Sequence, residues 1–196
     1  MKHLFFLLLL PISLQAQPPY QQHIADHRAA YKQAFVDDSH APLDEAGVEK
    51  LAFFPPDSAY RVKAAFERTK EAEPFDMATY SGITKPYVQY GTLTFELHDT
   101  TLQMAVYQSL RLVRMPQYRD HLFIPFKDVT NGEATYGGGR YMDISKNDIK
   151  EGQLQIDFNK AYNPYCAYSD GYNCPIPPVA NHLPVAIEAG ERSYPE

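Results

Sequence analysis

The first segment with a regular pattern of apolar residues has the spacing of a helix. Residues 21–35 contain no proline, and their alanines favour the helical state. Apolar side chains on one face of this helix are Ile24, Tyr31 and Phe35. A short second helix is predicted over residues 44–51, where acidic residues in the first turn suit the helix dipole and Pro55-Pro56 follows as a stop. We therefore expect a helical N-terminal extension over residues 17–56.

Beyond residue 57 the apolar residues recur at every second position, as in half-buried strands. This alternation covers residues 60–67, residues 92–97 and the run from Leu154 to Phe158. A turn at residues 98–101 leads into residues 102–108 and predicts an antiparallel hairpin.

A second turn is predicted at Asn131-Gly132, because Asn-Gly readily adopts the positive φ that such turns require. It would join a strand over residues 122–126 to one over residues 135–144. Several short strands linked by turn residues predict a mainly β fold, an antiparallel sandwich or barrel-like sheet spanning residues 57–196. The regular pattern stops after Phe158, so residues 159–191 are expected to form a long irregular C-terminal loop.

The N-terminus has the layout of a secretory signal peptide. Lys2 and His3 precede an apolar run over residues 4–10, and Ala16 provides a small residue before a cleavage site. The apolar run has about half the length of a membrane-spanning helix, so no membrane anchor is expected after cleavage. We expect residues 1–16 to be removed and the protein to be exported, to the periplasm or the extracellular space.

Composition and charge narrow the classes of protein. Apolar residues make up 44% and charged residues 21% of the chain, which indicates a folded domain with a core. The formal net charge is −6 and basic residues do not cluster, so nucleic acid and anionic membranes are poor partners. A small molecule or a peptide is the expected partner.

The two cysteines are Cys166 and Cys174. In an exported chain they predict a disulfide that closes a small loop, and their spacing differs from the C-x-x-C of zinc sites and redox pairs. Reduced thiols and metal binding remain alternatives, with His182 as a nearby imidazole.

Gly137-Gly138-Gly139 precedes Arg140, an arrangement that allows two interpretations. The glycines would let the backbone approach an anion that the guanidinium binds. Alternatively, they form a bulge or tight turn, and Arg140 pairs internally with Asp143 or Asp157.

Further candidates are carboxylates, tyrosines, amides and histidines. Two carboxylates that converge can perform acid/base chemistry or bind a hard cation, although each can equally cap a turn or pair with an arginine. Tyrosine rings suit sugar or peptide ligands, or pack the loop on the sheet. Amides can bind a ligand or satisfy loop backbone. The candidates are Asp143, Asp157, Glu188 and Glu191; Tyr162, Tyr165, Tyr168 and Tyr172; Asn159, Asn163 and Asn181; His121 and His182.

These same residues form a combination that resembles the family named domain of unknown function 1684. The segments that carry the resemblance are Phe126-Lys127-Asp128, Tyr136 through Asp143, Asp157-Phe158-Asn159, Tyr162-Asn163-Pro164, Cys166-Ala167-Tyr168, Cys174-Pro175, Pro177-Pro178, Asn181 and Glu188-Ala189-Gly190-Glu191. Upstream, Phe53 through Asp57, Tyr60-Arg61-Val62 and Tyr90-Gly91 resemble a shorter, exported bacterial branch of that family. The resemblance implies no activity, cofactor or catalytic residue.

The sequence favours a small-ligand-binding module with a polar pocket at the disulfide-pinned loop. Arg140 would contact an anion, Tyr141 and Tyr162 would form the walls, and the polar anchors would be Asp157, Asn159, Asn163 and Glu188. One alternative is a hydrolytic enzyme that uses Asp143 with Asp157 or Glu188. Another is an envelope interaction protein that uses the Pro- and Tyr-rich loop as its contact surface. The sequence identifies no catalytic residue, cofactor or metal site.

Overall fold

The computed structural model describes residues 19–195, so the predicted signal peptide lies outside the described residues. The predicted N-terminal helices are present as α1 (Pro19–Asp37) and α2 (Glu45–Val48). The Asp44 carboxylate caps α2 by accepting a 2.9 Å hydrogen bond from the Gly47 amide. No helix within residues 19–195 combines the length and apolar character needed to cross a membrane.

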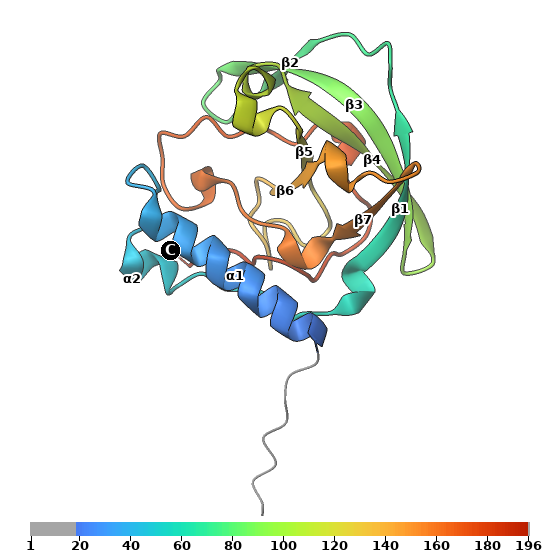
Figure 1. Ribbon diagram of the computed structural model, residues 1–196. Helices are drawn as coiled ribbons and strands as arrows, with labels where there is room; N and C mark the ends of the chain where they lie inside the picture. The colour runs from blue at the N-terminus through green and yellow to red at the C-terminus, as the bar shows by residue number, and fades with distance from the viewer. Residues whose placement is uncertain (1–18, 196) are drawn as a thin grey trace, which may run out of the picture.

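Seven strands form one antiparallel sheet, which confirms the predicted mainly β, barrel-like fold. The strands are β1 (Arg61–Arg68), β2 (Phe75–Ala78), β3 (Thr84–Leu97), β4 (Thr100–Ser109), β5 (His121–Phe126), β6 (Arg140–Ser145) and β7 (Gln153–Asp157). Their order is β6-β5-β4-β3-β1-β7, and β2 pairs with β3. The long strands β3 and β4 bend, so the sheet curls into a half-barrel (Figure 1).

The two predicted hairpins have different outcomes. The β3–β4 turn is confirmed, with His98 and Asp99 at φ 49° and 59°, the positive values of a two-residue hairpin loop. Strands β5 and β6 also pair, but Asn131-Gly132 is not their hairpin turn. The Asn131 side chain accepts from the Asp128 amide and donates to the Tyr136 carbonyl. These bonds hold a compact loop, so the strand predicted over residues 135–144 begins only at Arg140.

The sheet carries an apolar layer on each of its two faces. The inner face of the curl carries the larger cluster, which includes Leu93, Met104, Ile124 and Ile156. The outer face carries a smaller aromatic cluster that includes Tyr87, Tyr107, Phe123 and Tyr141. Successive side chains of a strand point to opposite faces, so the middle strands contribute to both layers.

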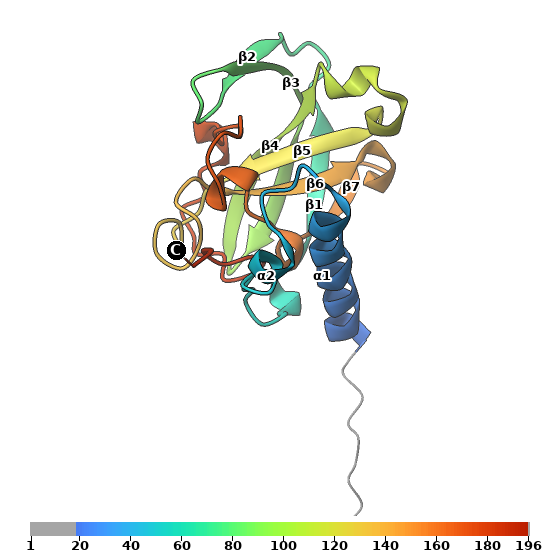
Figure 2. The same cartoon turned by 90° about the vertical axis from the view of Figure 1, so that its left-hand side faces the viewer.

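The two ends of the strand order, β6 and β7, do not pair with each other, so the barrel is not closed. We call the gap between these two edges the seam. Helix α1 lies alongside β6 and β7 (Figure 2). It packs on the short 3₁₀ turn Phe158–Lys160 that follows β7. The helix therefore covers part of the seam.

Candidate functional site

A cleft of about 760 Å³ lies between α1 and the seam, and we call it the seam cleft. Its floor is apolar and comes from the inner-face residues Met142, Leu154 and Ile156 on the two edge strands. Its aromatic lining comes from α1 and from the C-terminal loop: Tyr31, Phe35, Tyr162 and Tyr165. The terminal strands of the strand order, β6 and β7, therefore both contribute to one concave, largely apolar surface, the usual setting of a ligand site.

The rim of the seam cleft carries charges of both signs. Lys150 and Lys160 form no ion pair with any residue in the described range 19–195, and the Lys160 side chain is half-buried. Burial lowers the pKa of His27, and the positive charge of Lys160 lowers it further. Because His27 is thus held neutral at pH 7, the positive charge at this end of the cleft comes from Lys160.

Asp157 stands at the same end of the cleft, where β7 turns into the 3₁₀ segment. Its carboxylate accepts from the Asn159 amide and from the Tyr20 hydroxyl, at 3.1 and 3.0 Å. Burial and the neighbouring Asp157 raise the pKa of Tyr20, so the hydroxyl stays protonated as a donor. Asp157 therefore ties the start of α1 to the end of β7.

Asp143 and Tyr162 stand where the seam cleft meets a second groove, of about 370 Å³, over the outer face of the sheet. The Asp143 carboxylate binds His121 Nε2 at 2.8 Å through one oxygen and accepts from the Tyr162 hydroxyl at 2.5 Å through the other. Burial and Asp143 both raise the pKa of Tyr162 well above its usual range. With Nε2 donating to Asp143, a neutral His121 has its lone pair on Nδ1, a buried atom without a hydrogen-bond partner in the described chain.

The second groove, which we call the outer groove, is bordered by the disulfide loop. Cys166 and Cys174 form the predicted disulfide. Tyr141 lies in this groove and donates its hydroxyl to the Pro175 carbonyl, which fastens the loop to β6. Of the two tyrosines predicted as walls, Tyr141 lines only the outer groove and Tyr162 lines both cavities.

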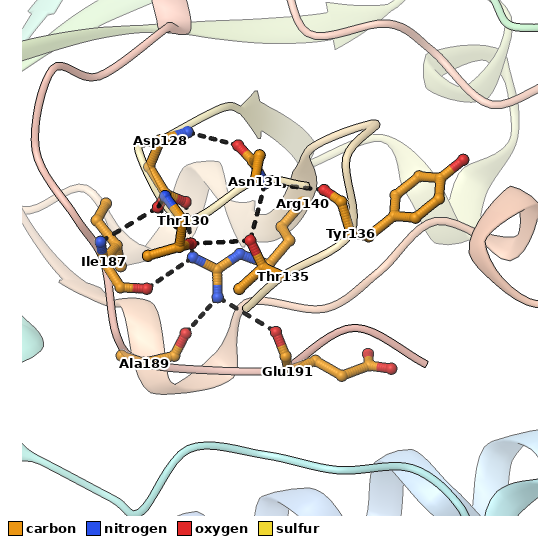
Figure 3. A network of polar contacts seen from close by, with 9 residues as sticks. All are labelled: Asp128, Thr130, Asn131, Thr135, Tyr136, Arg140, Ile187, Ala189 and Glu191. Atoms are coloured by element: carbon orange, nitrogen blue, oxygen red, sulfur yellow. Dashed lines mark hydrogen bonds and ion pairs between the residues drawn. The ribbon is translucent and has the colours of Figure 1, made fainter. Parts of the chain in front are cut away.

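Arg140 occupies the interior. Figure 3 shows its guanidinium among the Asp128 carboxylate and the carbonyls of Ile187, Ala189 and Glu191. The Arg140–Asp128 contact is 2.7 Å, and neither side chain is exposed to solvent. Burial lowers the pKa of Arg140, and Asp128 opposes that change. The side chain holds the C-terminal tail and presents no surface to an anion.

The internal partner of Arg140 is Asp128, not Asp143 or Asp157. Neither of the two expected partners pairs with Arg140, because the Asp143 side chain points to the outer face and Asp157 lies at the end of another strand. The glycine run is also explained by packing. Gly139 has φ 92°, and a Cβ there would lie 2.6 Å from the Phe126 carbonyl oxygen.

The three candidate asparagines are buried and satisfy main-chain groups. Asn159 binds both backbone groups of Asp57, and Asn163 donates to the Arg192 carbonyl. Asn181 accepts from the Ala105 amide and donates to the carbonyls of Ala105 and Pro125, between β4 and β5. These two strands pair directly only at Tyr107–Phe123, so the Asn181 amide replaces missing ladder bonds. None of the three asparagines lines the seam cleft or the outer groove.

The carboxylates separate into different environments. Asp143 and Asp157 both line the seam cleft, but each is already bound to other side chains, while Glu188 is exposed and lines neither cavity. Glu191 is fully buried and accepts from the hydroxyls of Tyr31 and Tyr168, at 3.0 and 2.6 Å. Burial raises the pKa of Glu191 to about 7, against the lowering effect of these hydrogen bonds. Within residues 19–195 no group of three or more His, Cys, Asp or Glu is arranged to hold a metal ion.

Sequence reasoning missed the contributions of α1 and of the lysines. The helical periodicity identifies Tyr31 as part of an apolar face, but no pattern marks His27 or Lys160 as lining a cleft. A regular helix gives no local signal of what it covers. The triplet Phe126-Lys127-Asp128 contained the partner of Arg140, but its spacing from Arg140 does not reveal the pairing.

Comparisons with known proteins identify relatives without a known activity. A family model described as "Protein of unknown function (DUF1684)" matches residues 46–192. The solution NMR structure of an uncharacterized protein of Haloarcula marismortui is similar with a TM-score of 0.68 and 32% identity, over 88% of this chain and 94% of that one. No curated protein matches.

Proposed function

Since the chain belongs to the DUF1684 family, whose description assigns no activity, we propose from its own geometry that it binds a small organic molecule or a short peptide in the seam cleft. The main support for the proposal is the cleft itself, which α1 forms together with the edge strands β6 and β7. A volume of about 760 Å³ lies within the range of ligand sites, and an apolar floor with few polar groups is typical of them.

The lining indicates the chemistry of the ligand. An apolar or aromatic body would cover Leu154 and Ile156 and contact the rings of Tyr31 and Tyr162. Lys160, half-buried and without an ion pair in the described chain, would attract an acidic group at the end near His27. The proposed ligand is therefore an amphipathic molecule that carries a carboxylate or another anionic group.

A blocking substitution tests this proposal. Ala34 is an exposed α1 residue that lines the seam cleft, so Ala34→Trp fills the cleft without disturbing the core. Ala29→Trp is the matched control, since Ala29 is also exposed on α1 but does not line the cleft. A thermal-shift screen of acidic metabolites, fatty acids and short peptides identifies ligands of the unmodified chain.

A ligand at a hundred times its Kd should raise Tm by roughly 5–10 °C in a domain of this size. The shift should persist in Ala29→Trp, disappear in Ala34→Trp and weaken in Lys160→Met. If no compound shifts Tm, or if Ala34→Trp responds like the unmodified chain, the seam cleft is not a ligand site.

Export is part of the same proposal. The Cys166–Cys174 disulfide supports it, because such bonds persist in oxidising compartments. Fractionation of bacteria that express the full chain should find it processed and outside the cytoplasm. Recovery of the unprocessed chain from the cytoplasm would contradict export.

A further inference from the structure

Within residues 19–195, the edge of β6 that faces the seam has one residue with both its N–H and its C=O free of hydrogen bonds. Lys146 N donates to Asp120 O, so these two residues form a hydrogen-bonded pair of the antiparallel β5–β6 ladder. Hydrogen-bonded and non-hydrogen-bonded pairs alternate along such a ladder, so every second residue of β6 points its backbone groups away from β5. Tyr141, Asp143 and Ser145 consequently direct N–H and C=O away from β5. Tyr141 uses these groups to pair with Tyr162, which confirms the direction.

The Ser145 amide donates to Asp148, so Asp143 is the β6 residue that offers both a donor and an acceptor to the seam. No residue in the range 19–195 forms a backbone hydrogen bond with Asp143 on this side.

The facing edge of β7 also has free backbone groups within the described residues. Phe66 N donates to Gly152 O, so Leu154 and Ile156 direct their backbone groups to β1, while Gln153, Gln155 and Asp157 direct theirs to the seam. The backbone N–H and C=O of Gln153 both form hydrogen bonds with the backbone of Lys150. Gln155 keeps a free N–H and C=O within the described part of the chain, and its side chain is exposed.

Asp143 and Gln155 both line the seam cleft, from opposite edges. An uncovered strand edge is a template for pairing with another extended chain. Helix α1 lies over the cleft, but it satisfies its own backbone and offers only side chains to the two edges. The seam cleft thus combines free strand edges with an apolar floor, which is the arrangement used in recognition by strand addition.

We propose that the ligand of the seam cleft is an extended peptide, which pairs its backbone with Gln155 of β7 and Asp143 of β6 and so completes the barrel. This inference rests on the proposed ligand-binding function and names its ligand class. Alternate peptide side chains point to opposite sides. One set would contact the apolar floor, the other would contact Tyr31 and Phe35 of α1, and an acidic group would meet Lys160.

The test uses two substitutions at one position. Gln155→Pro removes the seam-facing N–H, and proline is tolerated on an edge strand whose N–H makes no ladder bond. Gln155→Ala also removes the glutamine side chain, but it keeps the backbone N–H. The probe is a pooled library of hexapeptides with alternating apolar and polar residues and a free carboxyl end, and the affinities of its best binders are measured by titration calorimetry.

We expect hexapeptides to bind the unmodified chain and Gln155→Ala with the same affinity. They should bind Gln155→Pro about tenfold more weakly, because one backbone hydrogen bond in a desolvated site is lost. N-methylation of single amides in the best hexapeptide should lower its affinity for the unmodified chain at alternate positions. This second measurement does not depend on how Gln155→Pro folds.

Two results would overturn the inference while leaving the proposed function intact. In the first, small molecules bind in the cleft and are blocked by Ala34→Trp, but no hexapeptide binds. In the second, hexapeptides bind but neither Gln155→Pro nor N-methylation matters, which means that they bind without strand pairing. If neither small molecules nor peptides bind, the proposed function fails as well.

Discussion

Arg140→Met should be among the most destabilising substitutions in this protein. Methionine keeps the aliphatic stem but removes a guanidinium that binds Asp128 and three carbonyls of the C-terminal tail. Breaking a fully buried ion pair by removing one partner costs about 3–5 kcal/mol. Each carbonyl left buried without a donor adds about 1–3 kcal/mol, reduced where the tail relaxes. We expect the free energy of unfolding to fall by at least about 4 kcal/mol, a large part of the roughly 5–15 kcal/mol of a typical domain.

Urea denaturation, followed by circular dichroism and tyrosine fluorescence, measures this loss. Arg192→Met is the matched control, because Arg192 is exposed and its guanidinium lies over the Phe54 ring, at 5.4 Å from the ring centroid. It should change the free energy of unfolding by less than about 1 kcal/mol. If Arg140→Met were as mild as the control, Arg140 would not hold the tail, and its role as an anion contact would have to be reconsidered.

Three further predictions concern the same tail and loop. The pKa of Glu191 is about 7 in the folded chain against 4.5 ordinarily, so its stabilising contribution is complete below pH 4.5 and is lost as the pH rises through 7. Between these values the unmodified chain should lose about 3 kcal/mol more than Glu191→Gln in urea titrations, and parallel pH profiles would refute this. Replacing Cys166 and Cys174 by serine should lower the free energy of unfolding by about 2.5 kcal/mol, whereas a change below about 0.5 kcal/mol would show that the loop is held without the disulfide. Asn181→Ala should cost about 3 kcal/mol in the same assay through the loss of its bonds to Ala105 and Pro125, and a near-neutral result would mean that β4 and β5 close the gap themselves.

The sequence was most informative where structure depends on local periodicity. The alternation around Val62 and Leu93 predicted β1 and β3, and the turn at His98 was recognised from its residues. Family membership and the disulfide also followed from residues read in order. These features depend on neighbours in the chain, which is why a single sequence reveals them.

The candidate site was predicted less well because it depends on contacts between distant segments. The polar residues around Arg140 and Asn163 were grouped into one pocket since they lie close in sequence, but alternation and burial turn them in different directions. The seam cleft instead requires that β6 and β7 become the two ends of one curled sheet. It further requires that α1, more than a hundred residues upstream, lies beside them, and no local pattern encodes either condition.

A crystal structure of the chain with the tightest ligand from the screen tests the central claim most directly. We expect ligand density between α1 and the edges of β6 and β7, over Leu154 and Ile156, with an acidic group near Lys160. For a peptide, main-chain hydrogen bonds to Gln155 and Asp143 should be visible. A ligand bound in the outer groove or elsewhere on the surface, with the seam cleft empty, would show that the seam cleft is not the binding site.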